Sequence, residues 1–217
     1  MAPKIHLYMT TGSCSLASHI ALHESGLAFT TTDLDAHRGY PAKYLYLNPK
    51  GRVPILDLDG ELITETPAVL STISALVPEK RLLGSTVLEQ ARVQEWMAWL
   101  CGSVHGQAFG CVFRPARFVG EEKQMYDTVK AHGRQTVETC FASIDGKLKS
   151  KKNAVGDNFT VVDAYLYVFW RWGNLLKLGM QEEYPNYTRL VEEVMQRDSV
   201  KKAIASEDIS FDGSIDM

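Results

Sequence analysis

Residues 4–24 read Lys4-Ile-His-Leu-Tyr-Met-Thr-Thr-Gly-Ser-Cys-Ser-Leu-Ala-Ser-His-Ile-Ala-Leu-His-Glu24. The stretch opens with a strand-like apolar run and continues through the turn-prone Thr10–Ser13. Apolar residues then recur at helical spacing until Gly26, where such a helix would end. The pattern therefore predicts a strand, a turn and a helix, and it puts Cys14 where the strand gives way to the helix.

The next residues continue this alternation of strands and helices. Residues 28–34 are rich in Phe and Thr and predict a second strand, and a short helix begins at Pro41. Residues 54–58 and 61–64 flank Asp59-Gly60, a dipeptide that suits a tight hairpin turn because both positions tolerate positive φ. The first third of the chain therefore predicts a small mixed sheet with helices.

Helical patterns dominate the rest of the chain. Strand signals become sparse after Glu65, and apolar residues recur at three-to-four spacing over Leu88–Phe109 and Gln124–Leu148. Thr160-Val-Val-Asp163 has the form of a capping box and precedes an apolar stretch that ends at Trp172. Because that stretch is apolar nearly all round, we expect its helix to be the buried core of a second domain.

The change in pattern also predicts where the domains begin and end. We expect an α/β domain at residues 1–78, a linker at 79–87 and an all-helical domain at 88–217. Pro185–Gln196 predicts a last amphipathic helix. The acidic end, Glu207–Met217, has little to pack and is expected to fray.

Composition narrows the class of protein. The 217 residues are 45% hydrophobic, and 23 basic against 26 acidic residues give a net charge of −3, as in an ordinary globular protein without a nucleic-acid-binding stripe. No run approaches the ~18 apolar residues of a membrane span, and the first residues lack the pattern of a secretory signal. We therefore expect a cytoplasmic protein whose four cysteines are thiols rather than a disulfide framework.

Cys14 is the first candidate for chemistry. It lies in Gly12-Ser13-Cys14-Ser15, where backbone N–H groups and the positive end of a helix dipole would lower a thiol pKa. The thiolate favoured there could belong to Cys14 or to a ligand, and the alternative is that small residues merely fill a tight turn. No cysteine follows Cys14 after two intervening residues, so a two-cysteine redox motif is absent.

Two further motifs flank the predicted hairpin. Val53-Pro54 follows the turn Asn48-Pro-Lys-Gly-Arg52, and a cis proline there would turn the backbone of Val53 outward to pair with an extended peptide. An ordinary trans proline at a strand start is the alternative. In Thr64-Glu-Thr-Pro67, a carboxylate and a hydroxyl beside free helix N–H groups suit a substrate's ammonium and carboxylate, or they simply cap the helix.

Together these motifs resemble the glutathione-binding half of the cytosolic glutathione transferases. The cysteine in Gly12-Ser-Cys-Ser15 is most similar to that of the bacterial beta class and its fungal relatives. Residues 156–164 are similar to the family's capping-box motif in the sixth helix, so the resemblance covers nearly the whole chain. It implies an α/β, thioredoxin-like N-terminal domain followed by an all-helical C-terminal domain.

The resemblance also assigns candidate site residues in the first domain. Val53, ahead of a presumed cis Pro54, would pair with the cysteinyl part of glutathione, and Glu65 and Thr66 would bind its γ-glutamyl end. The family often has serine at the position of Thr66, but the hydroxyl is retained. Arg52 would reach the glycyl carboxylate, or it is simply an exposed arginine. Near the sulfur the candidates are Cys14 with Ser13 and Ser15 as alternative donors.

A second group of candidates lies in the helical domain. His105 either lines the active site, as a histidine does in beta-class relatives, or packs at an interface. Gly102, Gly106 and Gly110 recur every four residues, which indicates either close helix packing or a cleft widened for a bulky second substrate. Core packing is the alternative role for three candidate pocket walls, Phe109, Phe113 and Trp172. Cys101 and His105 lack paired metal-ligand spacing, so we expect no metal.

Four functions are compatible with these residues. The first is glutathione conjugation, in which the glutathione thiolate attacks a hydrophobic electrophile. The second is cis/trans isomerisation by reversible addition of that thiolate to a conjugated alkene, and the third is thiol transfer with Cys14 as the nucleophile. The fourth is ligand binding without turnover. The resemblance further implies a homodimer that uses glutathione as cosubstrate, in detoxification or secondary metabolism.

Overall fold

The computed structural model describes residues 2–214. Its sheet contains β1 (Ile5–Met9), β2 (Thr30–Asp33), β3 (Ile55–Leu58) and β4 (Glu61–Thr64), in the order β2-β1-β3-β4. β1 is parallel to β2 and antiparallel to β3, which forms a hairpin with β4. This mixed sheet, with its Asp59-Gly60 hairpin, agrees with the sequence pattern.

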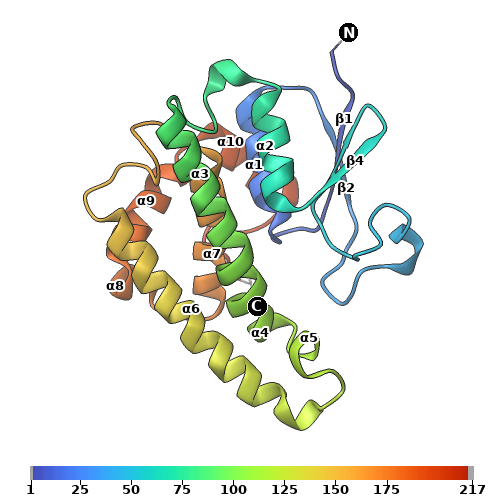
Figure 1. Cartoon of the computed structure of the whole chain (residues 1–217), viewed down its shortest axis with the longest axis vertical. Helices are drawn as coiled ribbons and strands as arrows, with labels where there is room; N and C mark the ends of the chain where they lie inside the picture. Colours follow the sequence, from blue (N-terminus) through green and yellow to red (C-terminus); the bar gives the residue numbers. More distant parts are fainter. Residues whose placement is uncertain (1, 215–217) are drawn as a thin grey trace.

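Two helices cover the face of the sheet that looks toward the rest of the molecule (Figure 1). They are α1 (Ser15–Ser25) and α2 (Thr66–Ala75), which pack against each other. Ile5, Leu7 and Met9 alternate with less buried residues along β1, and they enter the same core as these helices. The buried face of β1 therefore follows from its alternating apolar residues. A short helical turn, η1 (Ala42–Tyr44), lies in the loop between β2 and β3.

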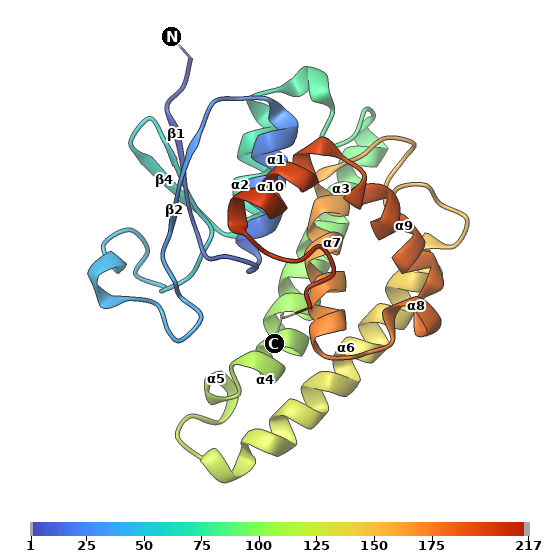
Figure 2. The same cartoon turned by 180° about the vertical axis from the view of Figure 1, so that it is seen from behind.

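The second half of the chain is helical (Figure 2). After the turn η2 (Pro78–Lys80), its elements are α3 (Val87–Trp99), η3 (Leu100–Phe109), α4 (Gly110–Phe113), α5 (Ala116–Val119), η4 (Lys123–Met125), α6 (Tyr126–Leu148), α7 (Val161–Leu175), α8 (Met180–Glu183), α9 (Pro185–Met195) and α10 (Asp198–Glu207). α7 is buried along almost its whole length and contacts α1, α3 and α9. The expectation of a buried core helix that begins at a capping box of Thr160 and Asp163 is met. Because the sheet domain precedes these helices in the chain, the structure confirms the predicted fold class, an α/β domain followed by an all-helical domain.

The helix predicted over Leu88–Phe109 differs from a regular α-helix. Its second part, Leu100–Phe109, is a π-helix, and the N–H of Gly110 reaches back five residues to the carbonyl of His105. A π-helix widens the turn and is frequent at functional sites. The sequence did not reveal it, because apolar residues spaced three or four apart are compatible with either helix type over so short a stretch.

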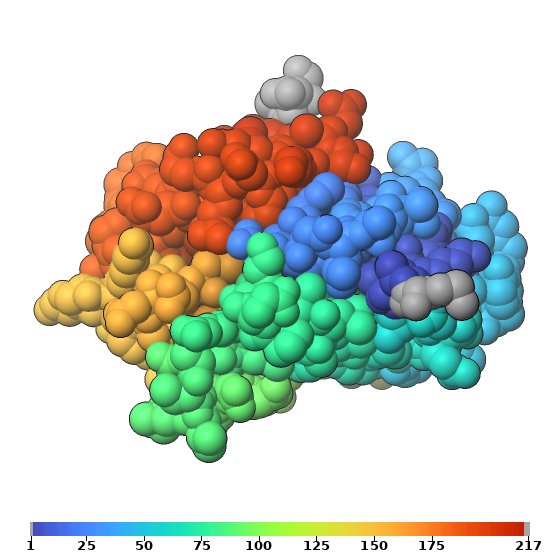
Figure 3. All heavy atoms as spheres, turned by 90° about the horizontal axis from the view of Figure 1, so that it is seen from above, coloured from blue at the N-terminus to red at the C-terminus, as the bar shows by residue number. Residues whose placement is uncertain are grey.

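The expectation that the acidic end frays is wrong for residues 207–214. α10 packs on α1, so that the red C-terminal residues lie directly against the blue N-terminal domain in Figure 3. Residues 210–212 continue along α7, because Tyr167 Oη donates to the carbonyl of Phe211 at 2.7 Å and Asn174 Nδ2 to that of Asp212 at 3.0 Å. The acceptors in the C-terminal segment are backbone carbonyls, which every residue has. The acidic side chains of this segment therefore did not indicate these hydrogen bonds. Residues 215–217 lie outside the described residues.

Candidate active site

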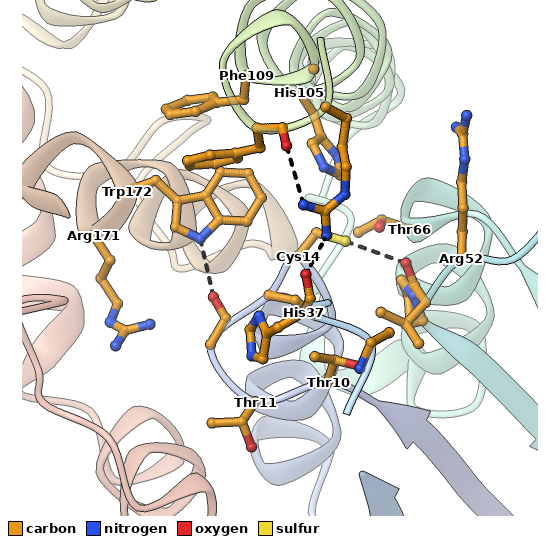
Figure 4. Close-up of a pocket in the computed structure, with 18 of the residues that line it drawn as sticks. Thr10, Thr11, Cys14, His37, Arg52, Thr66, His105, Phe109, Arg171 and Trp172 are labelled. Carbon is orange, nitrogen blue, oxygen red and sulfur yellow. Dashed lines mark hydrogen bonds between the residues drawn. The ribbon is translucent and has the colours of Figure 1, made fainter. Parts of the chain in front are cut away.

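A cavity of about 770 Å³ lies between the two halves of the chain (Figure 4). From the first half it is lined by the turn after β1, the loop before β3 and the start of α2. From the second half it is lined by η3, α4, α5, α7 and the segment after α10. Most of the site residues expected from sequence line it: Ser13, Cys14, Arg52, Val53, Pro54, Glu65, Thr66, His105, Gly106, Phe109, Phe113 and Trp172.

The turn that carries Cys14 is held by the helical half. The N–H of Gly12 donates to Glu207 Oε2 at 2.7 Å, and its carbonyl accepts from Trp172 Nε1 at 3.0 Å. Gly12 has φ +66°, a conformation that glycine adopts without steric cost. The position of Cys14 therefore depends on residues at the far end of the sequence.

Ser15 lies outside the cavity, although the sequence made it a candidate donor. It is fully buried, its Oγ accepts from the N–H of Thr10 at 3.1 Å, and it lies 2.7 Å from Ser13 Oγ. The chain therefore presents the Ser13 hydroxyl to the cavity, while Ser15 stabilises the turn beneath it.

The Cys14 thiol is buried and neutral. Its side chain is 6% exposed, and Sγ donates to the carbonyl of Val53 at 3.3 Å. Burial raises the pKa of Cys14 to about 11, because it outweighs the hydrogen bonds from the hydroxyls of Thr66 and Ser13 that lower it. The start of α1 therefore does not produce a Cys14 thiolate at neutral pH, contrary to one of the two options left open by the sequence.

Alkylation of Cys14 by iodoacetamide is therefore expected to be slow at pH 7. A pKa of about 11 gives a thiolate fraction ~300-fold below that of a free cysteine, whose pKa is about 8.5. The pH dependence should show the thiol titrating above pH 10. Peptide mass spectrometry after timed alkylation measures this, with free cysteine as the reference. Rapid labelling of Cys14 with a midpoint near pH 7 would contradict the expectation and restore thiol transfer by Cys14.

The loop before β3 and the start of α2 form one side of the cavity. The Val53-Pro54 peptide bond is cis. Glu65, at φ +73°, adopts the left-handed region that non-glycine residues rarely occupy. Its carboxylate forms an ion pair with Lys50, whose Nζ also donates to Thr64 Oγ1 at 2.8 Å. The conformation of Glu65 thus fixes a carboxylate next to the free N–H groups that begin α2 at Thr66.

Aromatic rings form the opposite side. The ring of Trp172 lies 5.1 Å from that of Phe109 and 5.5 Å from that of Phe113, centroid to centroid. His105 lies 5.2 Å from the Trp172 ring, and its Nδ1 is 3.5 Å from Tyr165 Oη. Burial, more than the positive charges of nearby arginines, lowers the pKa of His105 to about 4. The imidazole is therefore neutral at physiological pH and is available for hydrogen bonding.

The three glycines of the π-helix region differ in what surrounds them. Gly106 and Gly110 line the cavity, whereas Gly102 does not. A Cβ on Gly102 would meet nothing within 4 Å, so neither close helix packing nor a widened cleft explains this glycine. A Cβ on Gly110 would lie 3.3 Å from the ring of Phe118, which occupies the space that the glycine leaves.

Several lining residues were not expected from the sequence. Arg114, Arg117 and Arg171 contribute positive charge, and residues 208–210 with 213–214 close one side. Their local sequence carries no motif, because they reach the cavity only through the packing of distant segments.

Within residues 2–214, no group of three or more His, Cys, Asp or Glu side chains is arranged to hold a metal ion. The described helices include none that is long and apolar enough to cross a membrane.

Comparison with known proteins adds to this geometry. Glutathione S-transferase GstA of Escherichia coli O157:H7 is 31% identical over 206 residues, which cover 93% of this chain and 98% of that protein. A sphingomonad glutathione S-transferase, solved in complex with glutathione, is 32% identical, with a TM-score of 0.82 over 94% of this chain and 100% of that one. A bacterial beta class glutathione S-transferase from Sphingomonas chungbukensis matches with the same identity, TM-score and coverage.

A more distant relative bears on the isomerase alternative. It is a maleylacetoacetate isomerase of Pseudomonas aeruginosa, 28% identical over 169 residues that cover 75% of this chain and 77% of that protein.

Residues 11–76 match the family described as Glutathione S-transferase, N-terminal domain, and residues 100–198 match Glutathione S-transferase, C-terminal domain. The resemblance inferred from the short motifs is therefore confirmed, and the chain belongs to the glutathione S-transferase family.

Proposed function

We propose that this transferase binds glutathione in the cavity between its two halves and uses the glutathione thiolate to attack an electrophile. The observation that carries the proposal is the convergence of Cys14, Val53, Glu65 and Thr66 on one wall of that cavity. A carboxylate, free helix N–H groups and a peptide-like edge are the partners that a γ-glutamyl tripeptide requires.

Each end of glutathione has a partner of suitable charge. The Glu65 carboxylate suits the γ-glutamyl ammonium, and the N–H groups at the start of α2, with the Thr66 hydroxyl, suit its carboxylate. Arg52, which lines the same wall, suits the glycyl carboxylate because a guanidinium binds a carboxylate with two parallel hydrogen bonds. The backbone of Val53 would pair with the cysteinyl part in between.

Cys14 acts in this proposal as a hydrogen-bond donor and not as a nucleophile. Its thiol keeps its proton at neutral pH, and it is aimed at the Val53 carbonyl, beside the expected position of the glutathione sulfur. When glutathione is bound, the Cys14 S–H would turn from the Val53 carbonyl to the glutathione sulfur. This donor and the Ser13 hydroxyl would then favour the glutathione thiolate over its thiol. The thiolate then forms a C–S bond with the electrophile, whose apolar part lies against the aromatic side of the cavity.

Glu65→Gln is expected to weaken glutathione binding about 10- to 100-fold, because it removes a charged hydrogen bond to the ammonium. Isothermal titration calorimetry at neutral pH measures the change. Half of the Glu65 side chain is exposed, so the variant should fold. Glu61→Gln, an exposed change on β4 outside the cavity, is the matched control. Equal affinity of both variants and wild type would refute this role of Glu65.

Isomerisation is the second candidate, favoured by the similarity to a maleylacetoacetate isomerase. It would use the same thiolate, which adds to a conjugated alkene and leaves again after rotation about the resulting single bond.

We further propose a cytoplasmic homodimer whose protomer has domains at 1–78 and 88–217. The end of α2 at Ala75 and the start of α3 at Val87 support this division, and sedimentation velocity tests the dimer.

A further inference from the structure

Positive charge is concentrated in the cavity. The charged residues among its described lining are four arginines, Arg52, Arg114, Arg117 and Arg171, against two acids, Glu65 and Asp208. Glu65 is already paired with Lys50. Glutathione would supply a glycyl carboxylate for Arg52, which leaves the arginines of the helical half without an anionic partner from the cosubstrate.

These arginines are not equivalent. Arg171 is 5% exposed and donates from Nη2 to the carbonyl of Ser210 at 2.9 Å, so it holds the C-terminal segment. Figure 4 shows it on the far side of Trp172 from Arg52. Arg114 donates to the carbonyls of Phe113 and His37, at 3.1 and 3.0 Å, and thereby joins the two halves of the chain. Both side chains therefore have a structural task.

Arg117 has no such task. Within residues 2–214 its guanidinium makes no hydrogen bond and no ion pair, although it lines the cavity. Burial and the charges of Arg52 and Arg114 lower its pKa, which remains high enough for the group to be a cation. A cavity cation surrounded by like charges gains free energy when an anion enters.

The backbone around Arg117 is fixed. α5 begins after Pro115, and its turn is closed by N–H bonds from Phe118 to Pro115 and from Gly120 to Ala116, both at 2.9 Å. The Phe118 ring fits over Gly110 and so attaches α5 to α4. Arg117 is thus an exposed cation on a fixed backbone segment, and it lies beside the aromatic side of the cavity, which continues through Phe113 on the neighbouring α4.

We propose that the electrophile is an organic anion whose carboxylate is bound by Arg117 while its apolar body packs against Phe113 and Trp172. The proposal rests on the proposed function, since it names the substrate class of the same site. It assigns Arg117 to specificity and leaves glutathione to the opposite wall. An aromatic or unsaturated acid fits this combination of flat apolar surface and fork-shaped donor.

A pair of probes that differ only in charge tests the proposal. They are 4-chloro-3,5-dinitrobenzoate and its neutral primary amide, 4-chloro-3,5-dinitrobenzamide. In each, the glutathione thiolate attacks the carbon that bears chlorine, a C–S bond forms, and the C–Cl bond breaks with release of chloride. Each kcat/KM is divided by the rate constant of the uncatalysed reaction with glutathione, which removes the difference in intrinsic reactivity.

Wild type is expected to prefer the carboxylate probe at least 10-fold by this measure. Arg117→Gln should abolish the preference through a higher KM for the benzoate, with the amide unchanged. Arg117→Lys should keep part of it, because the charge remains without the planar fork. Arg38→Gln, an exposed arginine next to the lining residue His37 but outside the cavity, controls for the overall change in charge and should behave as wild type.

The other outcomes separate the two proposals. The assignment of Arg117 is overturned if wild type uses both probes equally. It is also overturned if Arg117→Gln loses both activities to the same extent and has a raised KM for glutathione. Both results leave the transferase function standing. An equal loss of preference in Arg38→Gln also overturns it, since the effect would then be long-range. Absence of glutathione binding and of conjugate from either probe refutes the proposed function itself.

Discussion

Asp163→Ala is expected to lower the free energy of unfolding by about 3 kcal/mol or more. Asp163 is fully buried at the first turn of α7, and its carboxylate accepts three hydrogen bonds. They come from the N–H of Ala154 at 2.8 Å, the N–H of Thr160 at 2.7 Å and the Thr160 hydroxyl at 3.2 Å. Alanine would leave these three donors, at the start of the central helix α7, buried without a partner. Each unsatisfied donor lowers the free energy of unfolding by ~1 kcal/mol or more.

Urea unfolding followed by tryptophan fluorescence measures this loss. Asp157→Ala is the matched control, because Asp157 is exposed in the same loop and should change stability by no more than ~0.5 kcal/mol. Asp163→Asn keeps an acceptor oxygen and should fall between alanine and wild type. If Asp163→Ala unfolded at the wild-type urea concentration, the capping box would not be the anchor of the helical half.

Glu207→Ala is expected to cost a similar ~3 kcal/mol and also to weaken glutathione binding. Its carboxylate accepts from His19 Nδ1 at 2.9 Å and from the N–H of Gly12 at 2.7 Å, and both side chains of the Glu207–His19 pair are buried. Removing one partner leaves a buried imidazole and a buried N–H unsatisfied. The Gly12 turn, which carries Ser13 and Cys14 into the cavity, would also lose one of its two attachments to the helical half.

Two measurements separate the parts of this prediction. Urea unfolding reports the stability loss, and calorimetric titration with glutathione reports the effect on the turn. Glu207→Gln should recover part of both, because an amide oxygen still accepts from Gly12, and exposed Glu192→Ala should change neither. A fully stable Glu207→Ala protein with wild-type glutathione affinity would show that the C-terminal helix does not support the site.

Much of the fold was predictable because its signals are local. The strand and helix around Cys14 and the Asp59-Gly60 hairpin depend on periodicity and backbone preference over a few residues. The capping box of Thr160 and Asp163 is likewise a pattern four residues long, and the structure contains it. The acidic C-terminal segment was misjudged because its partners are distant in the sequence. Glu207 bonds to His19 and to the backbone of Gly12 in the first domain, and residues 211 and 212 bond to α7.

The candidate site was predictable to the extent that short motifs carry it. Motifs around residues 12–15, 48–54 and 64–68 named one wall of the cavity, because each combines a backbone conformation with a side chain of defined chemistry. No motif pointed to Arg114 or Arg117, since two arginines among apolar neighbours (residues 111–119) have the same local sequence whether they face solvent or a cavity.

The sequence by itself determined the order of the strands, the two halves and the chemical character of the cavity wall that we propose binds glutathione. Its expectation that Pro185–Gln196 is the last helix is wrong, because α10 follows at Asp198–Glu207. Only the tertiary structure decided the state of Cys14, because the pKa of a thiol depends on how far burial outweighs nearby donors. It also decided what holds the turn of Gly12, which is bonded to a residue 195 positions away. Desolvation and charge clustering arise from packing between distant segments, and no pattern within one segment records them.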